Sequence, residues 1–277
     1  MKTIGITGGK GGTGKSTIAT ALAVELGKHN KVLLVDMDVD CPNDHLILSI
    51  ERKQVEEIHQ RIPKWDFKKC KKCGLCGPIC KVNAIVSIKE RNPIFMSHQC
   101  NGCGACVFIC PVNAITWTKK EIGKIYTGKA YNIDFLAGEL KANEPFSEFV
   151  VNSVKEFFLK NKKKYDYIII DTAAGTHCNV ISALDICNII LAVTEPTPLG
   201  SHDLKLILRL VKLLNIKTNI VLNRSNIGDK KLIRPIVSEY KTKIIAEIPY
   251  KKEILEAYSK GKPVQDKRIQ KIIQKIR

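Results

Sequence analysis

A glycine-rich segment near the start of the chain carries the residue types that bind phosphate. Gly9, four further residues, Gly14, Lys15 and Ser16 follow one another with the spacing of a phosphate-binding loop. Glycines let backbone N–H groups approach phosphate oxygens, Lys15 reaches the β- and γ-phosphates, and the Ser16 hydroxyl is the expected Mg²⁺ ligand. An apolar strand precedes the loop and a helical pattern follows it. The segment therefore predicts a site for a nucleoside triphosphate and Mg²⁺.

Eight of the eleven cysteines fall in two runs, each with gaps of two, two and three residues. This spacing is typical of bacterial ferredoxins, in which each of two [4Fe–4S] clusters takes three ligands from one run and the fourth from the other. A pair of zinc sites is the alternative. The compartment is expected to be reducing and cytoplasmic. The predicted ligands are Cys70, Cys73, Cys76 and Cys110 for the first cluster, and Cys80, Cys100, Cys103 and Cys106 for the second.

The two cysteine runs are also an internal repeat. Residues 70–85 read CKKCGLCGPICKVNAI and residues 100–115 read CNGCGACVFICPVNAI, with Lys81 where the second run has Pro111. Residues 63–129 resemble two-cluster ferredoxins. Positive charge near a cluster is expected to raise its potential and attract an acidic redox partner, with a solvated basic surface as the alternative. The lysines that crowd the first run are Lys68, Lys69, Lys71, Lys72 and Lys81.

The composition fits one large domain and a small module. The chain has 277 residues, 44% of them hydrophobic, and a formal net charge of +18. Such a charge suggests an acidic partner, nucleic acid or an anionic surface. The sequence has no run of eighteen apolar residues and no signal-peptide pattern, so neither a membrane span nor secretion is expected.

Apolar strands alternate with helical patterns on both sides of the cysteine runs, which predicts an α/β fold with a doubly wound, mostly parallel sheet. The small ferredoxin-like α+β module is expected as an insert after the second strand, giving an ATPase domain in two parts, residues 1–62 and 130–277, around an inserted domain of residues 63–129. The predicted strands are Thr3–Thr7, Lys31–Asp36, Tyr131–Ala137, Tyr167–Asp171, Ile189–Thr194, Thr218–Asn223 and Lys243–Ile248. The predicted helices are Lys15–His29, Glu51–Gln60, Phe146–Lys160, Ser201–Leu214, Lys230–Tyr240 and two C-terminal segments.

The segment from Lys10 to Thr17, KGGTGKST, matches the deviant Walker A motif KGGxGKST. Outside the insert the chain resembles the MinD, ParA, Mrp and nitrogenase iron protein superfamily of P-loop ATPases, and the whole resembles members of it that contain an inserted ferredoxin domain. The resemblance implies a dimer with ATP sandwiched between subunits, either two copies or a copy and a paralogue, in which Lys10 reaches the nucleotide of the opposite subunit. It also implies that ATP or ADP is bound by Gly9, Lys10, Gly11, Gly12, Thr13, Gly14, Lys15, Ser16 and Thr17.

Residues at predicted strand ends complete the site that this resemblance implies. Asp38 would activate the attacking water, together with Lys10 and Lys15 as catalytic groups. Asp171 would be the Walker B acid, and the Mg²⁺ ligands would be Ser16, Asp36 and Asp171. Asp40 would lie near Mg²⁺ or in the first switch, with a loop cap as the alternative. The base would be read by Asn223, Arg224 and Pro249, with a strand-end turn as the alternative for Asn223.

Two further features have counterparts in the superfamily. Cys178 follows Asp171 by seven residues, an offset similar to that of a cluster-ligating cysteine in the nitrogenase iron protein, but no second such cysteine has a match here. Whether Cys178 binds an additional cluster is left open. Ile269, Ile272, Ile273 and Ile276 share one face of a C-terminal helical pattern. MinD proteins use such a helix on membranes, but packing on the domain's own sheet is the expectation.

The sequence as a whole predicts an ATP-binding and ATP-hydrolysing iron–sulfur protein. Its nucleotide state would gate electron transfer through two [4Fe–4S] clusters to a partner redox enzyme. An iron–sulfur carrier or assembly ATPase is one alternative. A positioning ATPase of the MinD or ParA kind is the other. Membrane and nucleic acid are not the expected partners.

Overall fold

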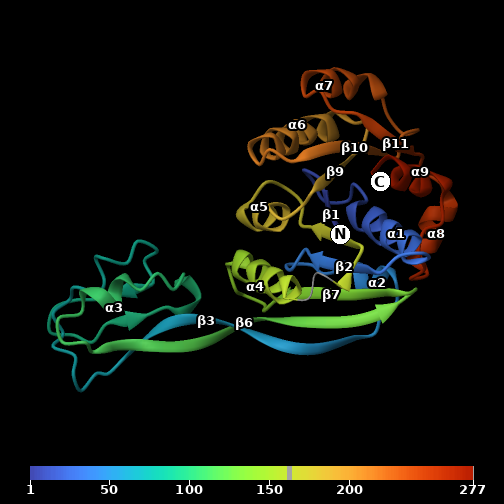
Figure 1. Cartoon of the computed structure of the whole chain (residues 1–277). Helices are drawn as coiled ribbons and strands as arrows, with labels where there is room; N and C mark the ends of the chain where they lie inside the picture. The colour runs from blue at the N-terminus through green and yellow to red at the C-terminus, as the bar shows by residue number, and fades with distance from the viewer. Residues whose placement is uncertain (161–163, 277) are drawn as a thin grey trace.

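A nine-stranded sheet in the order β11-β10-β9-β1-β8-β2-β7-β6-β3 forms the centre of the computed structural model (Figure 1). The structure describes residues 1–160 and 164–276; residues 161–163 and 277, which belong to the predicted second part of the ATPase domain, lie outside it. The first seven strands in that order are parallel, which confirms the predicted α/β class. These strands are β1 Lys2–Thr7, β2 Val32–Met37, β7 Ile133–Leu140, β8 Tyr167–Thr172, β9 Ile189–Thr194, β10 Lys217–Asn223 and β11 Ile244–Ile248.

Helices cover both faces of the parallel strands, because these strands are apolar on both sides. One face is covered by α1 Lys15–Gly27, α2 Asp44–Ile47, α8 Lys252–Ser259 and α9 Lys267–Ile276. The other is covered by α4 Ser147–Leu159, α5 Cys178–Leu184, α6 Pro198–Leu213 and α7 Arg234–Glu239. The predicted helix Lys230–Tyr240 is divided into a 3-10 turn, Lys230–Leu232, and α7, which has Pro235 in its first turn.

A long antiparallel hairpin of β3 Arg52–Trp65 and β6 Ile115–Ala130 extends from the edge of the sheet (Figure 1). The β6 strand pairs with β7 only from Gly123 to Ala130, so the rest of the hairpin projects beyond the sheet. The predicted helix over Glu51–Gln60 is wrong, because these residues lie in β3. Backbone pairing with β6 overrides their helix propensity, and Ile58, Gln60 and Ile62 alternate as buried positions.

Residues 66–114 form a small unit at the far end of the hairpin (Figure 1). Its regular elements are β4 Ile85–Val86, β5 Ile94–Phe95, a 3-10 turn over Ser97–Gln99 and α3 Ala105–Ile109. Two small apolar clusters hold it together, one around Cys100 and one around Cys106, and both include further cysteines. An interior of this size usually needs additional stabilisation from disulfides or a metal. The predicted limits of the insert, residues 63 and 129, fall within β3 and β6 and remain a prediction.

The C-terminal isoleucine stripe lies inside the protein. Ile269, Ile272, Ile273 and Ile276 of α9 are all buried in the cluster that α1 shares, which confirms the expectation that this stripe packs on the domain itself. No helix within the described residues is long and apolar enough to cross a membrane.

Candidate functional site

The phosphate-binding loop connects β1 to α1 and is shaped by its glycines. Gly12 and Gly14 have φ angles of +80° and +90°, which glycine adopts without strain. A Cβ at Gly14 would also collide with the side chain of Asn223. Asn223 ends β10, and its Nδ2 donates a 2.7 Å hydrogen bond to the Thr13 carbonyl oxygen. The predicted base-reading asparagine therefore contacts the loop.

A cavity of about 420 Å³ opens beside this loop. It gathers residues from strand ends on one edge of the sheet, where ligands bind in folds of this class. The predicted site residues that line it are Gly11, Gly12, Gly14, Lys15, Ser16, Thr17, Asp38, Asn223, Arg224 and Pro249. Several lining residues were not predicted: Tyr250 after β11, Ile254 and Tyr258 of α8, and Asp266 before α9. No local motif marks these four.

Two lysines of the loop have different surroundings. Lys15 is 6% exposed and lies beside the cavity, with its Nζ 3.5 Å from the carbonyl oxygen of Lys10. The Nζ of Lys10 instead pairs with Glu195 Oε2 at 3.3 Å. Glu195 is buried after β9 and also accepts a 2.5 Å bond from Arg224. Lys10 is therefore held by its own chain.

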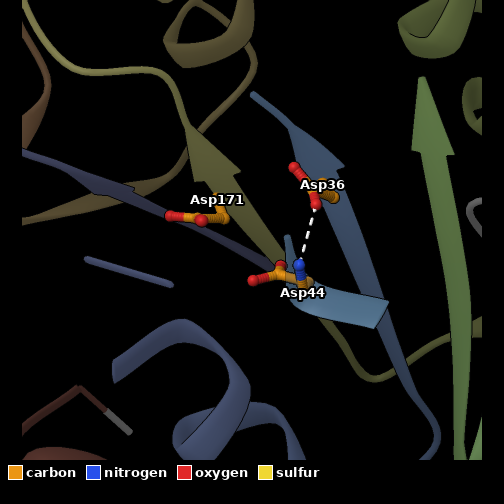
Figure 2. A group of neighbouring side chains, drawn as sticks. All are labelled: Asp36, Asp44 and Asp171. Atoms are coloured by element: carbon orange, nitrogen blue, oxygen red, sulfur yellow. Dashed lines mark hydrogen bonds between the residues drawn. The ribbon is translucent and has the colours of Figure 1, made fainter. Parts of the chain in front are cut away.

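Three aspartates, Asp36, Asp44 and Asp171, lie close together near the ends of β2 and β8 (Figure 2). One carboxylate oxygen from each of Asp36, Asp44 and Asp171 lies within 4.8 Å of the other two. Asp36 accepts hydrogen bonds from the backbone N–H groups of Asp38 and Asp44, each 3.1 Å long. Asp36 and Asp171 were predicted at this place, whereas Asp44 was not. A single acid that opens a four-residue helix carries no signal of its own in the sequence.

Burial dominates the titration of these acids. It raises the pKa of Asp36 and of Asp44 well above the ordinary value, and the neighbouring Asp171 raises both further. Burial also raises the pKa of Asp171 to about 7, although a hydrogen bond from Ser16 and the charge of Lys15 act in the opposite direction. For Asp38 burial again raises the pKa, and Lys15 lowers it. Such a group of carboxylates can hold a divalent cation or retain protons.

The eight predicted cluster ligands lie in the unit at the end of the hairpin. Cys70, Cys73, Cys76 and Cys110 line one small cavity. The other four are also neighbours: burial raises the pKa of Cys100, as do Cys80 and Cys103. Burial likewise raises the pKa of Cys106 to about 11, with further contributions from Cys100 and Cys103. None of these eight cysteines takes part in a disulfide.

The backbone around the cysteines repeats as the sequence does. The N–H groups of Lys72 and Gly102 donate to the Sγ atoms of Cys70 and Cys100 at 3.4 Å. Those of Ala84 and Ala114 donate to the Sγ atoms of Cys80 and Cys110 at 3.3 Å. Residues two after the first cysteine of each run, Lys72 and Gly102, both have positive φ angles. Each run thus presents its first and fourth sulfur atoms in the same way.

The other cysteines lie in the main body. Cys187 is buried in the core, where it packs as a small apolar side chain, and burial raises the pKa of its thiol. Cys41 is exposed after the first-switch aspartates, and Cys178 is exposed at the start of α5. The additional cluster that the sequence left open at Cys178 is not tested by these positions.

The chain matches the family described as the CobQ/CobB/MinD/ParA nucleotide binding domain over residues 4–264. An uncharacterized protein of Methanocaldococcus jannaschii is 38% identical over 262 residues, which are 94% of this chain and 90% of that relative. The septum site-determining protein MinD of Helicobacter pylori is 24% identical over 94% of this chain and 82% of its own length.

Solved structures show the same fold. MinD of Pyrococcus horikoshii complexed with Mg-ADP has a TM-score of 0.60 and 21% identity, with coverage of 98% of this chain and 93% of that chain. The MinC:MinD cell division protein complex of Aquifex aeolicus has a TM-score of 0.57 and 20% identity, with coverage of 100% and 96%. At these identities the likeness concerns the fold alone.

Proposed function

Because the chain belongs to the CobQ/CobB/MinD/ParA nucleotide-binding family, we propose that it is a MinD/ParA-like ATPase whose cysteine unit holds two [4Fe–4S] clusters. The observation that carries the ATPase is the cavity in which Lys15, Ser16 and Asp38 meet beside a glycine loop. ATP or ADP occupies this cavity with its phosphates on the loop. Asn223, Arg224 and Pro249 line the same cavity and are proposed to hold the base.

Hydrolysis follows from the positions of these groups. Lys15 lies where it can neutralise charge on the phosphates, and Ser16 provides a hydroxyl for Mg²⁺. Asp38 lines the cavity and is proposed to orient the attacking water. The buried Asp171 accepts a hydrogen bond from Ser16 and so positions the metal-binding hydroxyl. The test is Mg²⁺-dependent release of phosphate from ATP, which Asp38→Asn is expected to abolish while ADP still binds.

The dimer proposed for this ATPase requires Lys10 to move. The family resemblance implies that Lys10 reaches the nucleotide of the opposite subunit, whereas here its side chain pairs with Glu195 of its own chain. ATP-bound subunits would therefore exchange this internal ion pair for a contact with a partner's phosphates. Whether the partner is a second copy or a paralogue is decided by the mass of the ATP-bound complex of the isolated chain.

Electron transfer and positioning are the two finer functions considered for such an ATPase. The relatives named MinD favour the positioning alternative over gated electron transfer. Positioning on a membrane would need a lipid-binding segment, and the candidate helix α9 buries its isoleucine stripe in the core. Lipid co-sedimentation and salt-sensitive DNA binding test this alternative directly.

The cysteine unit is the observation that favours electron transfer. Four thiols from both runs line one cavity, and the other four are mutual neighbours, as crosswise ligation of two clusters requires. Backbone N–H groups that point at four of the sulfur atoms would stabilise thiolate charge and raise the cluster potentials. The metal content of the protein purified without oxygen distinguishes iron from zinc. The stable ligand set also favours electron transfer over transfer of whole clusters to another protein.

A continuous set of contacts joins the first switch, which is the segment containing Asp38 and Asp40, to the cysteine unit. These contacts support gating by nucleotide. Val39, between Asp38 and Asp40, accepts a 2.8 Å hydrogen bond from the N–H of Leu140. The segment after β7 then brings Glu144 to Lys120 at 2.6 Å, and Lys120 Nζ also donates to the Ser97 carbonyl oxygen at 3.1 Å.

This contact set ends beside a predicted cluster ligand. The charge of Lys120 lowers the pKa of Cys100 against the dominant effect of burial. A movement of the first switch on ATP binding would therefore reach a charge near the second cluster. Redox titration of the clusters with ADP and with ATP tests this coupling, because identical potentials in both states would exclude it.

A further inference from the structure

The three neighbouring aspartates come from three separate elements. Asp36 lies near the end of β2, Asp171 near the end of β8, and Asp44 is the first residue of α2 (Figure 2). Their exposed fractions are 1%, 1% and 0%. Because one carboxylate oxygen of each residue lies within 4.8 Å of the other two, the three side chains form a compact group of oxygen ligands that repel one another strongly when charged.

Asp44 is the member of this group that neither the motif nor the proposed hydrolysis uses. Both of its carboxylate oxygens are buried and lack a hydrogen-bond partner among the described residues. One oxygen of Asp171 is in the same condition. A buried carboxylate without a partner is costly, so such a group calls for a ligand at this position. The backbone N–H of Asp44 donates to Asp36 and thereby holds the two carboxylates together.

We propose that Asp44 completes, with Asp36 and Asp171, a divalent-cation site that binds Mg²⁺ or Mn²⁺ before any nucleotide is present. Hard cations of this kind prefer carboxylate oxygens. Nucleotide-bound Mg²⁺ is normally held by one or two carboxylates together with the phosphates. Three carboxylates exceed that number and provide affinity without phosphates. The inference rests on the nucleotide-site part of the proposed function and is independent of the clusters.

The site lies next to the nucleotide cavity. Asn43 and Ile47, on either side of Asp44, line that cavity. Ser16 also lines it and donates a hydrogen bond to Asp171. An ion can therefore reach the three carboxylates from the cavity after local displacement of the short α2 segment, and the Ser16 hydroxyl is available as a further oxygen ligand.

Titration of the full-length, nucleotide-free protein with Mn²⁺, followed by the EPR signal of free Mn²⁺, tests the proposal. We expect one bound Mn²⁺ per chain, displaced by excess Mg²⁺. Asp44→Asn keeps the size of the side chain and the backbone bond to Asp36, and it should weaken Mn²⁺ binding by at least about tenfold. Asp185→Asn is the matched control, because Asp185 pairs with Lys155 away from the site, and its Mn²⁺ affinity should equal that of the wild type.

The proposal is overturned if no Mn²⁺ binds without nucleotide, or if the affinity for Mn²⁺ is unchanged in Asp44→Asn. If Asp44→Asn does not fold, the thermal midpoint of the wild type decides. It should rise on addition of Mn²⁺ without nucleotide, and an unchanged midpoint overturns the proposal. Mg²⁺-dependent ATP hydrolysis by the same preparation distinguishes failure of this proposal from failure of the proposed ATPase function. Hydrolysis by a protein that binds no Mn²⁺ without nucleotide would refute the cation site but not the ATPase.

Discussion

Lys10 forms an ion pair with Glu195 of its own chain, and removing this ion pair should favour the dimer. Glu195→Gln is expected to tighten ATP-dependent dimerisation of two copies of the chain about thirtyfold. The two charged atoms are 3.3 Å apart, which corresponds to about 5 kcal/mol of attraction at an effective dielectric constant of about 20. Because 28% of the Lys10 side chain is exposed, water offsets most of this, and about 1 kcal/mol per subunit remains to be lost on dimerisation. Both subunits of a dimer of two copies lose this ion pair, so the total of about 2 kcal/mol corresponds to about a thirtyfold change in the dimerisation constant.

Sedimentation equilibrium with Mg-ATP measures this change, in an Asp38→Asn background expected to abolish hydrolysis. Glu247→Gln is the matched control, because it removes the same charge from a surface pair with Lys230. Glu195 also pairs with Arg224, so ADP affinity is measured in parallel to separate an effect on the nucleotide from one on the dimer. A dimer that is unchanged or weaker in Glu195→Gln, with ADP affinity intact, would refute the role given to Lys10.

Four further predictions concern the nucleotide site and the cysteine unit. Lys15→Met should weaken ADP binding at least about tenfold by calorimetry, because a charged contact to phosphate is lost; equal affinity would contradict the loop assignment. Burial raises the pKa of Asp171 from 3.8 to about 7, so the folded state holds this proton more tightly than the unfolded state does. Without metal and nucleotide, the thermal midpoint should therefore fall as the pH rises from about 4 to about 7, and this decrease should be smaller in Asp171→Asn. An equally large decrease in the variant would show that Asp171 is not the group responsible. Cys73→Ser and Cys110→Ser should each remove the same cluster and about half of the iron, whereas Cys41→Ser should retain all of it; loss of different clusters would exclude crosswise ligation. Lys120→Met should lower the potential of one cluster in an EPR-monitored redox titration, because a positive charge beside Cys100 is lost. Lys141→Met, which breaks the exposed pair with Glu121, should leave the potentials unchanged. Equal potentials in Lys120→Met and the wild type would show that Lys120 does not couple the nucleotide site to the cluster.

The parallel sheet and the core of the nucleotide site could be predicted because both depend on local patterns. Continuous apolar runs identify buried parallel strands, and the ends of such strands meet at one edge of the sheet. This is why Asp38 and Asn223 were predicted beside the loop that they in fact border. Spacing alone likewise suggested which four cysteines share a cavity.

The remaining features depend on contacts between distant segments. Glu51–Gln60 contains good helix formers, and only its partner strand β6 makes it extended. Glu195 pairs with Lys10 across 185 positions of the sequence. Asp44 becomes a candidate metal ligand only because the fold brings it next to Asp36 and Asp171. Tyr250 and Tyr258 reach the cavity because the chain after β11 folds back over it. None of these pairings leaves a local pattern in the sequence.

Redox titration of the anaerobically purified protein, with ADP and then with ATP, tests the central claim that one chain joins a MinD/ParA-like ATPase to two clusters that respond to its nucleotide. We predict about eight iron atoms per chain, reducible [4Fe–4S] centres, and a potential or EPR line shape that differs between ADP and ATP. Zinc in place of iron, or clusters with identical properties in both nucleotide states, would contradict the account and leave a positioning ATPase as the better description.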